Sequence, residues 1–212
     1  MIEYKQISLN FGFKTIFKNF SLGIRRGEKV VIRGTSGLGK SSLFALALGF
    51  ILPQSGHVLF DRLPLNEDSV WDIRRKVAFV DQDVSIGNYK IADWFALVSG
   101  FEANRSLDFS NKTIKELLDF FELSPDTLEK GASDLSGGER QRAALLVSVL
   151  LKRDVFFLDE ATSALDKNLK RKVATFFTGR ADWTVLSISH DPVWLDSPSV
   201  RVFDLEATEW KQ

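Results

Sequence analysis

A glycine-rich octapeptide, Gly34-Thr35-Ser36-Gly37-Leu38-Gly39-Lys40-Ser41, constrains this chain more than any other segment. It fits the pattern G-x-x-x-x-G-K-[ST], between an apolar stretch typical of a strand, 29–32, and a stretch with helical periodicity, 40–48. In such a loop the glycines let backbone N–H groups surround phosphate oxygens, and the dipole of the following helix favours negative charge. The octapeptide therefore predicts a strand, a phosphate-binding loop and a helix, with a nucleotide as ligand.

Two side chains of this loop have predicted roles of their own. The Lys40 ammonium can reach the β- and γ-phosphates of ATP, and the Ser41 hydroxyl can bind Mg²⁺. With Ser42, which follows in the helix, the octapeptide makes up the predicted ATP-binding segment. The alternative is a glycine-rich turn without a ligand. It is disfavoured because four fixed positions rarely agree by chance in the expected strand-to-helix context.

Two carboxylates, Asp159 and Glu160, follow the fully apolar run Val155–Leu158. A strand that is apolar along its whole length is typical of a parallel sheet covered on both faces, and such sheets bind ligands beyond the carboxyl ends of their strands. We expect Asp159 to hold Mg²⁺ and Glu160 to act as the base that activates the attacking water. Two solvated acids at a strand end are the alternative, which the phosphate loop disfavours.

The segment 135–142 reads LSGGERQR, and a helix cap is its simplest interpretation. Ser136 and Glu139 make an S-x-x-E capping box. Gly137 and Gly138 are not explained by a cap, since each costs up to about 1 kcal/mol relative to alanine in a helix. A bare helix N-terminus is also an anion site. Because the chain already has one complete phosphate loop, the pattern favours a site shared with a second copy.

The order of the motifs resembles that of the ATP-binding subunits of ABC transporters over essentially the whole chain. The matching segments are the phosphate loop (Walker A), Gln82 (Q-loop), LSGGE at 135–139 (signature), VFFLDE at 155–160 (Walker B), SALD at 163–166 (D-loop) and His190 (H-loop). The resemblance implies a head-to-tail dimer, either a homodimer or a pair with a related ATPase subunit. Each ATP would lie between the Lys40 loop of one chain and Ser136, Gly137, Gly138 and Glu139 of the other.

Four further roles rest on the resemblance. It implies that Phe11 stacks on adenine, with Phe13 as the competing choice and a place in the core as a third interpretation. It implies that Gln82 contacts Mg²⁺ or the attacking water, and that His190 binds the γ-phosphate and orients that water. Asp166 would cross the dimer interface, although its place at the start of a helix is equally well explained by a cap.

Strands that alternate with helices around these motifs predict an α/β fold. The resemblance makes it a P-loop NTPase of the ABC ATPase type, a single domain over 1–212 with a mainly parallel sheet. Its nucleotide-binding core, with an antiparallel β subdomain, would take residues 1–82 and 150–212. A helical subdomain at 83–149 would carry the signature. Turn residues within 1–32 indicate antiparallel strands, the last of them at 29–32.

Charge, cysteine content and hydropathy restrict the kinds of partner and the location that we expect for this chain. The chain has 28 Lys and Arg against 28 Asp and Glu, so it lacks the basic excess of a nucleic-acid binder. It has 0 Cys, which excludes thiolate metal sites and disulfides. No apolar run approaches the ~20 residues that cross a bilayer, and the first residues do not resemble a secretory signal. We expect a cytoplasmic chain, peripheral on the cytoplasmic face of the membrane, that serves a separate transmembrane permease subunit.

The aromatic residues are unusually rich in Phe, with 18 Phe and 5 Trp against 2 Tyr. We expect part of them in the core and a docking cluster for the membrane partner at Ile86, Tyr89, Ile91, Trp94 and Phe95. An ATPase that serves a soluble assembly, such as a cofactor-assembly scaffold, is the alternative function. A regulator that binds nucleotide without turnover is disfavoured by the presence of Glu160 and His190.

Overall fold

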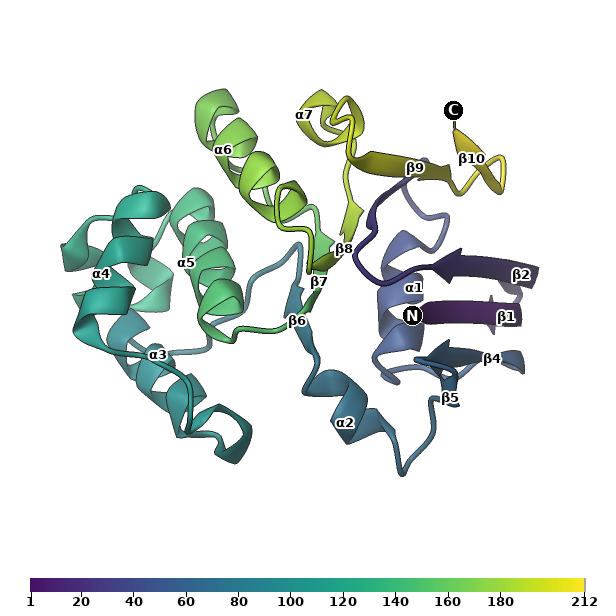
Figure 1. The fold of residues 1–212 in the computed structure, drawn as a ribbon, viewed down its shortest axis with the longest axis horizontal. Helices are drawn as coiled ribbons and strands as arrows, with labels where there is room; N and C mark the ends of the chain where they lie inside the picture. The colour runs from purple at the N-terminus through teal and green to yellow at the C-terminus, as the bar shows by residue number, and fades with distance from the viewer. Residues whose placement is uncertain (212) are drawn as a thin grey trace.

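The computed structural model describes residues 1–211, which form two sheets with helices around them (Figure 1). The first sheet is antiparallel, in the order β2-β1-β4-β5, and consists of β1 (Ile2–Phe11), β2 (Lys14–Ile24), β4 (Ser55–Phe60) and β5 (Leu63–Pro64). The second has the order β10-β9-β3-β8-β7-β6 and consists of β3 (Lys29–Arg33), β6 (Val77–Val80), β7 (Val155–Asp159), β8 (Thr184–Ile188), β9 (Val200–Asp204) and β10 (Glu209–Lys211). Its pairs are parallel except for β9 with β10. The predicted α/β fold with a mainly parallel core is confirmed.

Helices surround the parallel sheet. They are α1 (Lys40–Ala47), α2 (Val70–Arg74), α3 (Ile91–Gly100), α4 (Asn111–Phe120), α5 (Gly137–Leu150), α6 (Lys167–Thr178) and α7 (Pro192–Leu195). Short 3₁₀ turns at 102–104, 125–129 and 132–134 connect α3, α4 and α5. In the part of the chain that the structure describes, no helix has both the length and the apolar character of a membrane span.

Strand β3 leaves the antiparallel sheet, contrary to the expectation for residues 1–32. It pairs in parallel with β8 and β9, so that Val31 lies opposite Ser187 and Val202. The first four of its five residues are buried. A strand that is buried on both faces needs cover on both, and the centre of the parallel sheet provides it. The turn between β2 and β3 is therefore where the chain changes sheets.

The parallel sheet separates two hydrophobic clusters, because neighbouring side chains of a strand point to opposite faces. Phe157 of β7 belongs to the cluster shared with the antiparallel sheet and stacks on Phe44 of α1, with ring centroids 4.8 Å apart. Phe156 belongs to the other cluster and meets Phe177 of α6 edge-on at 5.1 Å. Much of the Phe excess is thus used to pack both faces of the sheet.

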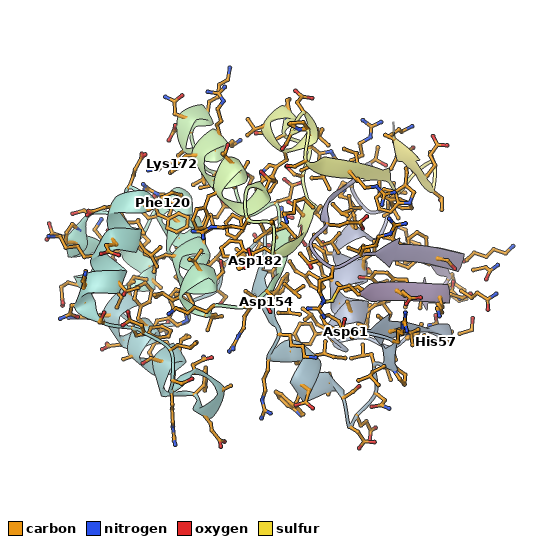
Figure 2. All side chains as sticks on the ribbon, viewed as in Figure 1. His57, Asp61, Phe120, Asp154, Lys172 and Asp182 are labelled. Atoms are coloured by element: carbon orange, nitrogen blue, oxygen red, sulfur yellow. The ribbon has the colours of Figure 1, made fainter. Side chains whose placement is uncertain are left out.

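Helices α3 and α4 lie at the opposite end of the molecule from the antiparallel sheet (Figure 1). Their apolar residues share one core cluster with α6 and the parallel sheet. Lys172 of α6 also lies over the Phe120 ring of α4, 4.8 Å from its centroid, and pairs with Glu122 at 3.3 Å (Figure 2). The helical segment therefore packs onto the core, and its division from the core at 83 and 149 stays a prediction.

The predicted docking cluster is wrong for most of its members. Ile86, Ile91 and Phe95 are buried, with 4%, 0% and 3% of their surface exposed. Trp94 is half-buried against the same core, and Tyr89 alone of the five is exposed. The reason is local geometry: residues four apart, such as 91 and 95, share one face of a helix, and α3 turns that face inward.

Candidate active site

The carboxyl ends of the parallel strands meet at one edge of the second sheet, as the sequence predicted. The phosphate loop follows β3, Gln82 follows β6, Asp159 ends β7, and His190 lies two positions beyond β8. A cavity of about 520 Å³ opens at this edge. It is lined by the predicted residues Phe11, Ser36, Gly37, Gly39, Lys40, Ser41, Ser42, Gln82, Asp159, Glu160 and His190, and also by Lys14, Ile16, Ser163 and Ile188.

The backbone of the phosphate loop depends on glycine at two positions. Gly37 and Gly39 have φ angles of 82° and 92°, in the left-handed region that L side chains disfavour. A Cβ on Gly39 would also lie 2.3 Å from Cγ2 of Ile16 in β2. Strand β2 of the antiparallel sheet therefore packs directly against the loop and restricts its conformation just before α1 begins.

Two ammonium groups lie on the loop. Lys40 Nζ donates hydrogen bonds to the carbonyl oxygens of Gly34 at 2.6 Å and Thr35 at 3.0 Å. Lys14 Nζ donates to the Gly37 carbonyl at 3.0 Å. Two positive charges beside a glycine-rich turn suit a polyphosphate ligand. Gly34 and Thr35 thus act through their carbonyls, and Leu38 packs against the core beneath the antiparallel sheet.

The cavity lining also contains two acidic residues, Asp159 and Glu160. Asp159 is buried, and burial raises the pKa of its carboxyl, opposed by the Ser41 hydroxyl and Lys40. The nearby carboxylates of Asp81 and Glu160 raise that pKa further. A buried carboxylate beside a hydroxyl suits Mg²⁺. Within residues 1–211 no three His, Asp or Glu side chains gather into a group that could hold a metal ion by themselves.

Glu160 and His190 lie beside each other in the lining of the cavity. His190 Nε2 lies 3.7 Å from Glu160 Oε1, beyond direct hydrogen-bond range, and both groups line the same space. Glu160 has a φ angle of 46°, a left-handed conformation that costs a non-glycine residue about 1–2 kcal/mol. Its N–H donates to the Ile188 carbonyl at 3.0 Å. Strand β8 therefore helps to hold the backbone in the conformation from which the carboxylate reaches the cavity.

The structure separates the two candidates for the adenine platform. Phe11 ends β1, is half-exposed and lines the cavity. Phe13, in the turn to β2, is fully exposed and lies outside the lining of the cavity. A ring that is half-exposed beside a phosphate loop can stack on a base through its free face. The geometry favours Phe11, whose contact with adenine stays a prediction.

The signature segment lies outside this cavity. Ser136 caps α5: its Oγ accepts from the Glu139 N–H at 3.2 Å, and its own N–H donates to Glu139 Oε2 at 2.8 Å. The Lys130 ammonium, 2.8 Å from Glu139 Oε1, lowers the pKa of Glu139 to about 2, together with the N–H and the hydroxyl of Ser136, which both donate to Glu139 Oε2 at 2.8 Å. The capping-box interpretation is therefore confirmed for Ser136 and Glu139.

The two signature glycines differ in what surrounds them. A Cβ on Gly138 would lie 3.0 Å from the Ala164 carbonyl, so a contact within the chain accounts for this glycine. A Cβ on Gly137 would have no neighbour within 4 Å among the described residues. Among residues 1–211 no such contact accounts for Gly137, and the anion site predicted for this helix end remains a prediction.

Asp166 acts as a helix cap. Its side chain accepts hydrogen bonds from the N–H groups of Asn168 at 2.9 Å and Leu169 at 3.2 Å at the start of α6. These bonds lower the pKa of its carboxyl. The cap alone accounts for an aspartate here, and the role across a dimer interface stays a prediction.

Several residues of this region have no role predicted from the sequence. Lys14 and Ile16 come from the antiparallel sheet, and Ile188 is the last residue of β8, just before the predicted His190. Gln141, inside the signature segment, carries no predicted role, although it lies four positions before the buried Leu145 on α5. A polar residue at the spacing of a buried helical face is the signal that marks it.

Comparison with known proteins agrees with this geometry. The family model described as ABC transporter matches residues 17–163. The chain belongs to the ABC transporter family. It is 30% identical over 200 residues to the energy-coupling factor transporter ATP-binding protein EcfA1 of Ligilactobacillus salivarius, covering 90% of this chain and 70% of that protein. It is 31% identical over 196 residues to the ATP-dependent lipid A-core flippase of Pseudoalteromonas atlantica, covering 89% of this chain and 34% of the flippase.

Solved structures of the ABC family share the fold. The dimeric structure of the bacterial ABC transporter cassette MJ0796 matches with a TM-score of 0.82 and 26% identity, covering 97% of this chain and 95% of that one. An Atm1-family ABC exporter with ATP bound matches with a TM-score of 0.83 at 22% identity, covering 100% of this chain and 38% of the exporter. The chain is therefore an ABC ATPase domain, and it spans about a third of the length of the flippase relatives.

Proposed function

We propose that this chain is the ATP-binding and ATP-hydrolysing subunit of an ABC transporter, and that it closes as a dimer around two ATP to drive a membrane-spanning partner. One observation carries the proposal. The phosphate loop, Asp159, Glu160 and His190 line one cavity, whereas the signature end of α5 is exposed elsewhere with an unexplained glycine, Gly137. A catalytic edge and a separate, exposed helix end that we expect to bind an anion would fit two chains arranged head to tail.

ATP binding uses the loop and its flanks. The Lys40 and Lys14 ammonium groups meet the phosphates, and the ring of Phe11 meets the base. Ser41, Asp159 and Gln82 would hold Mg²⁺, which when bound neutralises charge on the phosphate oxygens. This choice of ligands is supported by the hydrogen bond between Asp159 and the Ser41 hydroxyl, because Mg²⁺ prefers oxygen ligands of these kinds.

Hydrolysis uses the pair at the edge of β7 and β8. Glu160 takes a proton from water as the water oxygen attacks the γ-phosphorus, and the bond to the bridging oxygen of ADP breaks. His190, with Nε2 3.7 Å from Glu160 Oε1, orients that water and donates to the γ-phosphate. Gln82 lines the same cavity and offers its amide to the water or to Mg²⁺. ADP and phosphate are the products.

Sites shared between chains give a sharp prediction. Chains with Lys40→Ala lack the loop function, and chains with Ser136→Arg block the signature end; each is expected to be inactive alone. Mixed together, they should regain turnover, because each mixed dimer has one site with both halves intact. The measurement is phosphate release at several mixing ratios. A matched mixture of Lys40→Ala with Glu129→Gln, an exposed substitution on a chain that is otherwise native, calibrates the recovery; no recovery at any ratio in the first mixture would contradict shared sites.

The membrane partner is expected on the side of α2. Phe50, Leu52 and Trp71 are exposed large apolar residues, and the Arg74 guanidinium lies between two of the rings, 4.7 Å from Phe50 and 4.9 Å from Trp71. We call these four residues the α2 patch. Exposed apolar patches of this kind mark protein–protein sites. Helix α2 contacts β6, which leads to Gln82, so the patch is joined to the catalytic edge.

Affinity capture tests this part of the proposal. A tagged chain purified from detergent-solubilised membranes of its own cells should carry along a polytopic membrane protein on a separate chain. Trp71→Ser should weaken the association about 30-fold or more, since buried Trp anchors at interfaces are typically worth about 2 kcal/mol or more, while ATP turnover of the isolated chain persists. Phe13→Ser, which replaces a fully exposed aromatic outside the patch, is the matched control. Capture of soluble partners alone would favour the soluble-assembly alternative, and equal recovery by Trp71→Ser would place docking elsewhere.

A further inference from the structure

The side chain of Gln141 connects the signature helix to the catalytic segment. Its Nε2 donates to the Glu160 carbonyl at 3.2 Å and to Ser163 Oγ at 2.9 Å, and its Oε1 accepts from the Ala164 N–H at 3.0 Å. The Glu160 carbonyl can only accept and the Ala164 N–H can only donate, so one orientation of the amide satisfies both. Gln141 is 5% exposed, and every group of its amide is used.

The segment that Gln141 holds is one that needs support. Glu160 adopts a left-handed φ of 46°, and strained backbone of this kind persists only where its surroundings hold it. Strand β8 holds the Glu160 N–H, and Gln141 holds its carbonyl. On the far side, Trp194 Nε1 donates to Thr162 Oγ1 at 3.0 Å. The turn after β7 is thus anchored from α5 on one side and α7 on the other.

We propose that Gln141 is a positioning residue for hydrolysis, which holds the backbone of Glu160 and the D-loop turn against the helix that begins at Ser136. It acts through Glu160, because its amide is fully used by the backbone and by Ser163; it lines the neighbouring cavity, which shares Gln82 and Ser163 with the phosphate-loop cavity, and not the phosphate-loop cavity itself. The inference rests on the proposed function, in which Glu160 is the base. A shift of a catalytic group by about 1 Å costs up to about 100-fold in rate.

The test separates turnover from binding. Gln141→Met keeps the length of the side chain and removes all three hydrogen bonds. Gln141→Glu keeps an acceptor for the Ala164 N–H but, when ionised, cannot donate to Glu160. Both variants should lower kcat about 10- to 100-fold and leave ATP affinity, measured by calorimetry, nearly unchanged. Ser148→Ala is the matched control: its Oγ, also buried on α5, donates only to the Leu145 carbonyl at 2.7 Å, and its loss should lower stability without lowering kcat.

A double-mutant cycle identifies the route of the effect. In a Glu160→Gln background, Gln141→Met should cause no further loss of single-turnover hydrolysis, because the group that Gln141 positions is already disabled. An equal fractional loss in both backgrounds, an unchanged kcat, or a loss confined to ATP affinity would overturn the inference. If Glu160→Gln itself retains native turnover, the proposed function fails, a result distinct from failure of Gln141 alone.

Discussion

Glu160→Gln is expected to abolish steady-state ATP turnover while ATP binding is kept, and to let ATP trap the chain as a dimer. The amide fills the volume of the carboxylate but cannot take a proton from water, and loss of a general base costs about 100- to 10,000-fold. Binding should persist because Lys40, Lys14 and the loop that they contact are unchanged. Phosphate release measures turnover, and size exclusion with light scattering, with and without ATP, measures assembly.

The matched control for this variant is Glu129→Gln, which makes the same chemical change at an exposed side chain paired with Lys90 at 3.3 Å. It should turn over ATP at the native rate and show no stable ATP-dependent dimer. A Glu160→Gln chain that stays monomeric with ATP and hydrolyses it normally would remove Glu160 from the catalytic role. If the Glu160→Gln chain forms a dimer with ATP and still hydrolyses it, the proposed dimer stands and the catalytic base is a group other than Glu160.

Lys40→Ala is expected to weaken ATP binding about 10- to 100-fold, since hydrogen bonds to charged groups contribute about 1.5–3 kcal/mol each. Lys40 lies over its own loop at 2.6 Å and 3.0 Å from two carbonyl oxygens, where a phosphate would compete for the ammonium. Removing the ammonium leaves the glycine-shaped backbone in place, so the fold should survive. Calorimetric titration with ATP measures the loss, and circular dichroism checks the fold.

Lys115→Ala, at an exposed position of α4, provides the control for removing one positive charge. It should bind ATP with native affinity, whereas Lys14→Ala, with one contact to the loop at 3.0 Å, should fall between the two. Native affinity in Lys40→Ala would contradict the role of the phosphate loop. Equal losses in Lys40→Ala and Lys115→Ala would point to the overall charge of the chain instead.

Local sequence patterns predicted much of the fold, because the spacing of apolar residues reflects the period of a helix or a strand. The helix at 40–48 and the strand at 155–158 were identified from periodicity and composition, and the structure has α1 at Lys40–Ala47 and β7 at Val155–Asp159. The short elements α2, α7, β5 and β10 were missed, since two to five residues display too little of either period. The predicted residues at the ends of β3, β6, β7 and β8 meet in one cavity because parallel strands end at a shared edge.

The positions of the large apolar residues, in the core or on the surface, do not follow from local sequence patterns. Composition indicated an excess of Phe and Trp, but it could not tell a residue that faces a partner from one that faces the core. Ile91 and Phe95 are on the inward face of α3, whereas Phe50 and Trp71 are exposed near α2. That distinction depends on how each element packs, which no local pattern contains.

By itself, the sequence determined the ligand and the chemical groups around it. The order of its motifs, from Gly34 to His190, restricts the chain to one kind of phosphate chemistry, since the phosphate loop, Gln82, Asp159 and His190 each lie at or just beyond the end of a strand on the same edge of the sheet. The tertiary structure alone decided which groups contact one another. Strand β2 packs against Gly39, and the Ala164 carbonyl lies close to Gly138 but not to Gly137. The Gln141 amide donates a hydrogen bond to the Glu160 carbonyl. These contacts join residues from separate elements, and they exist only once long-range packing has brought those elements together.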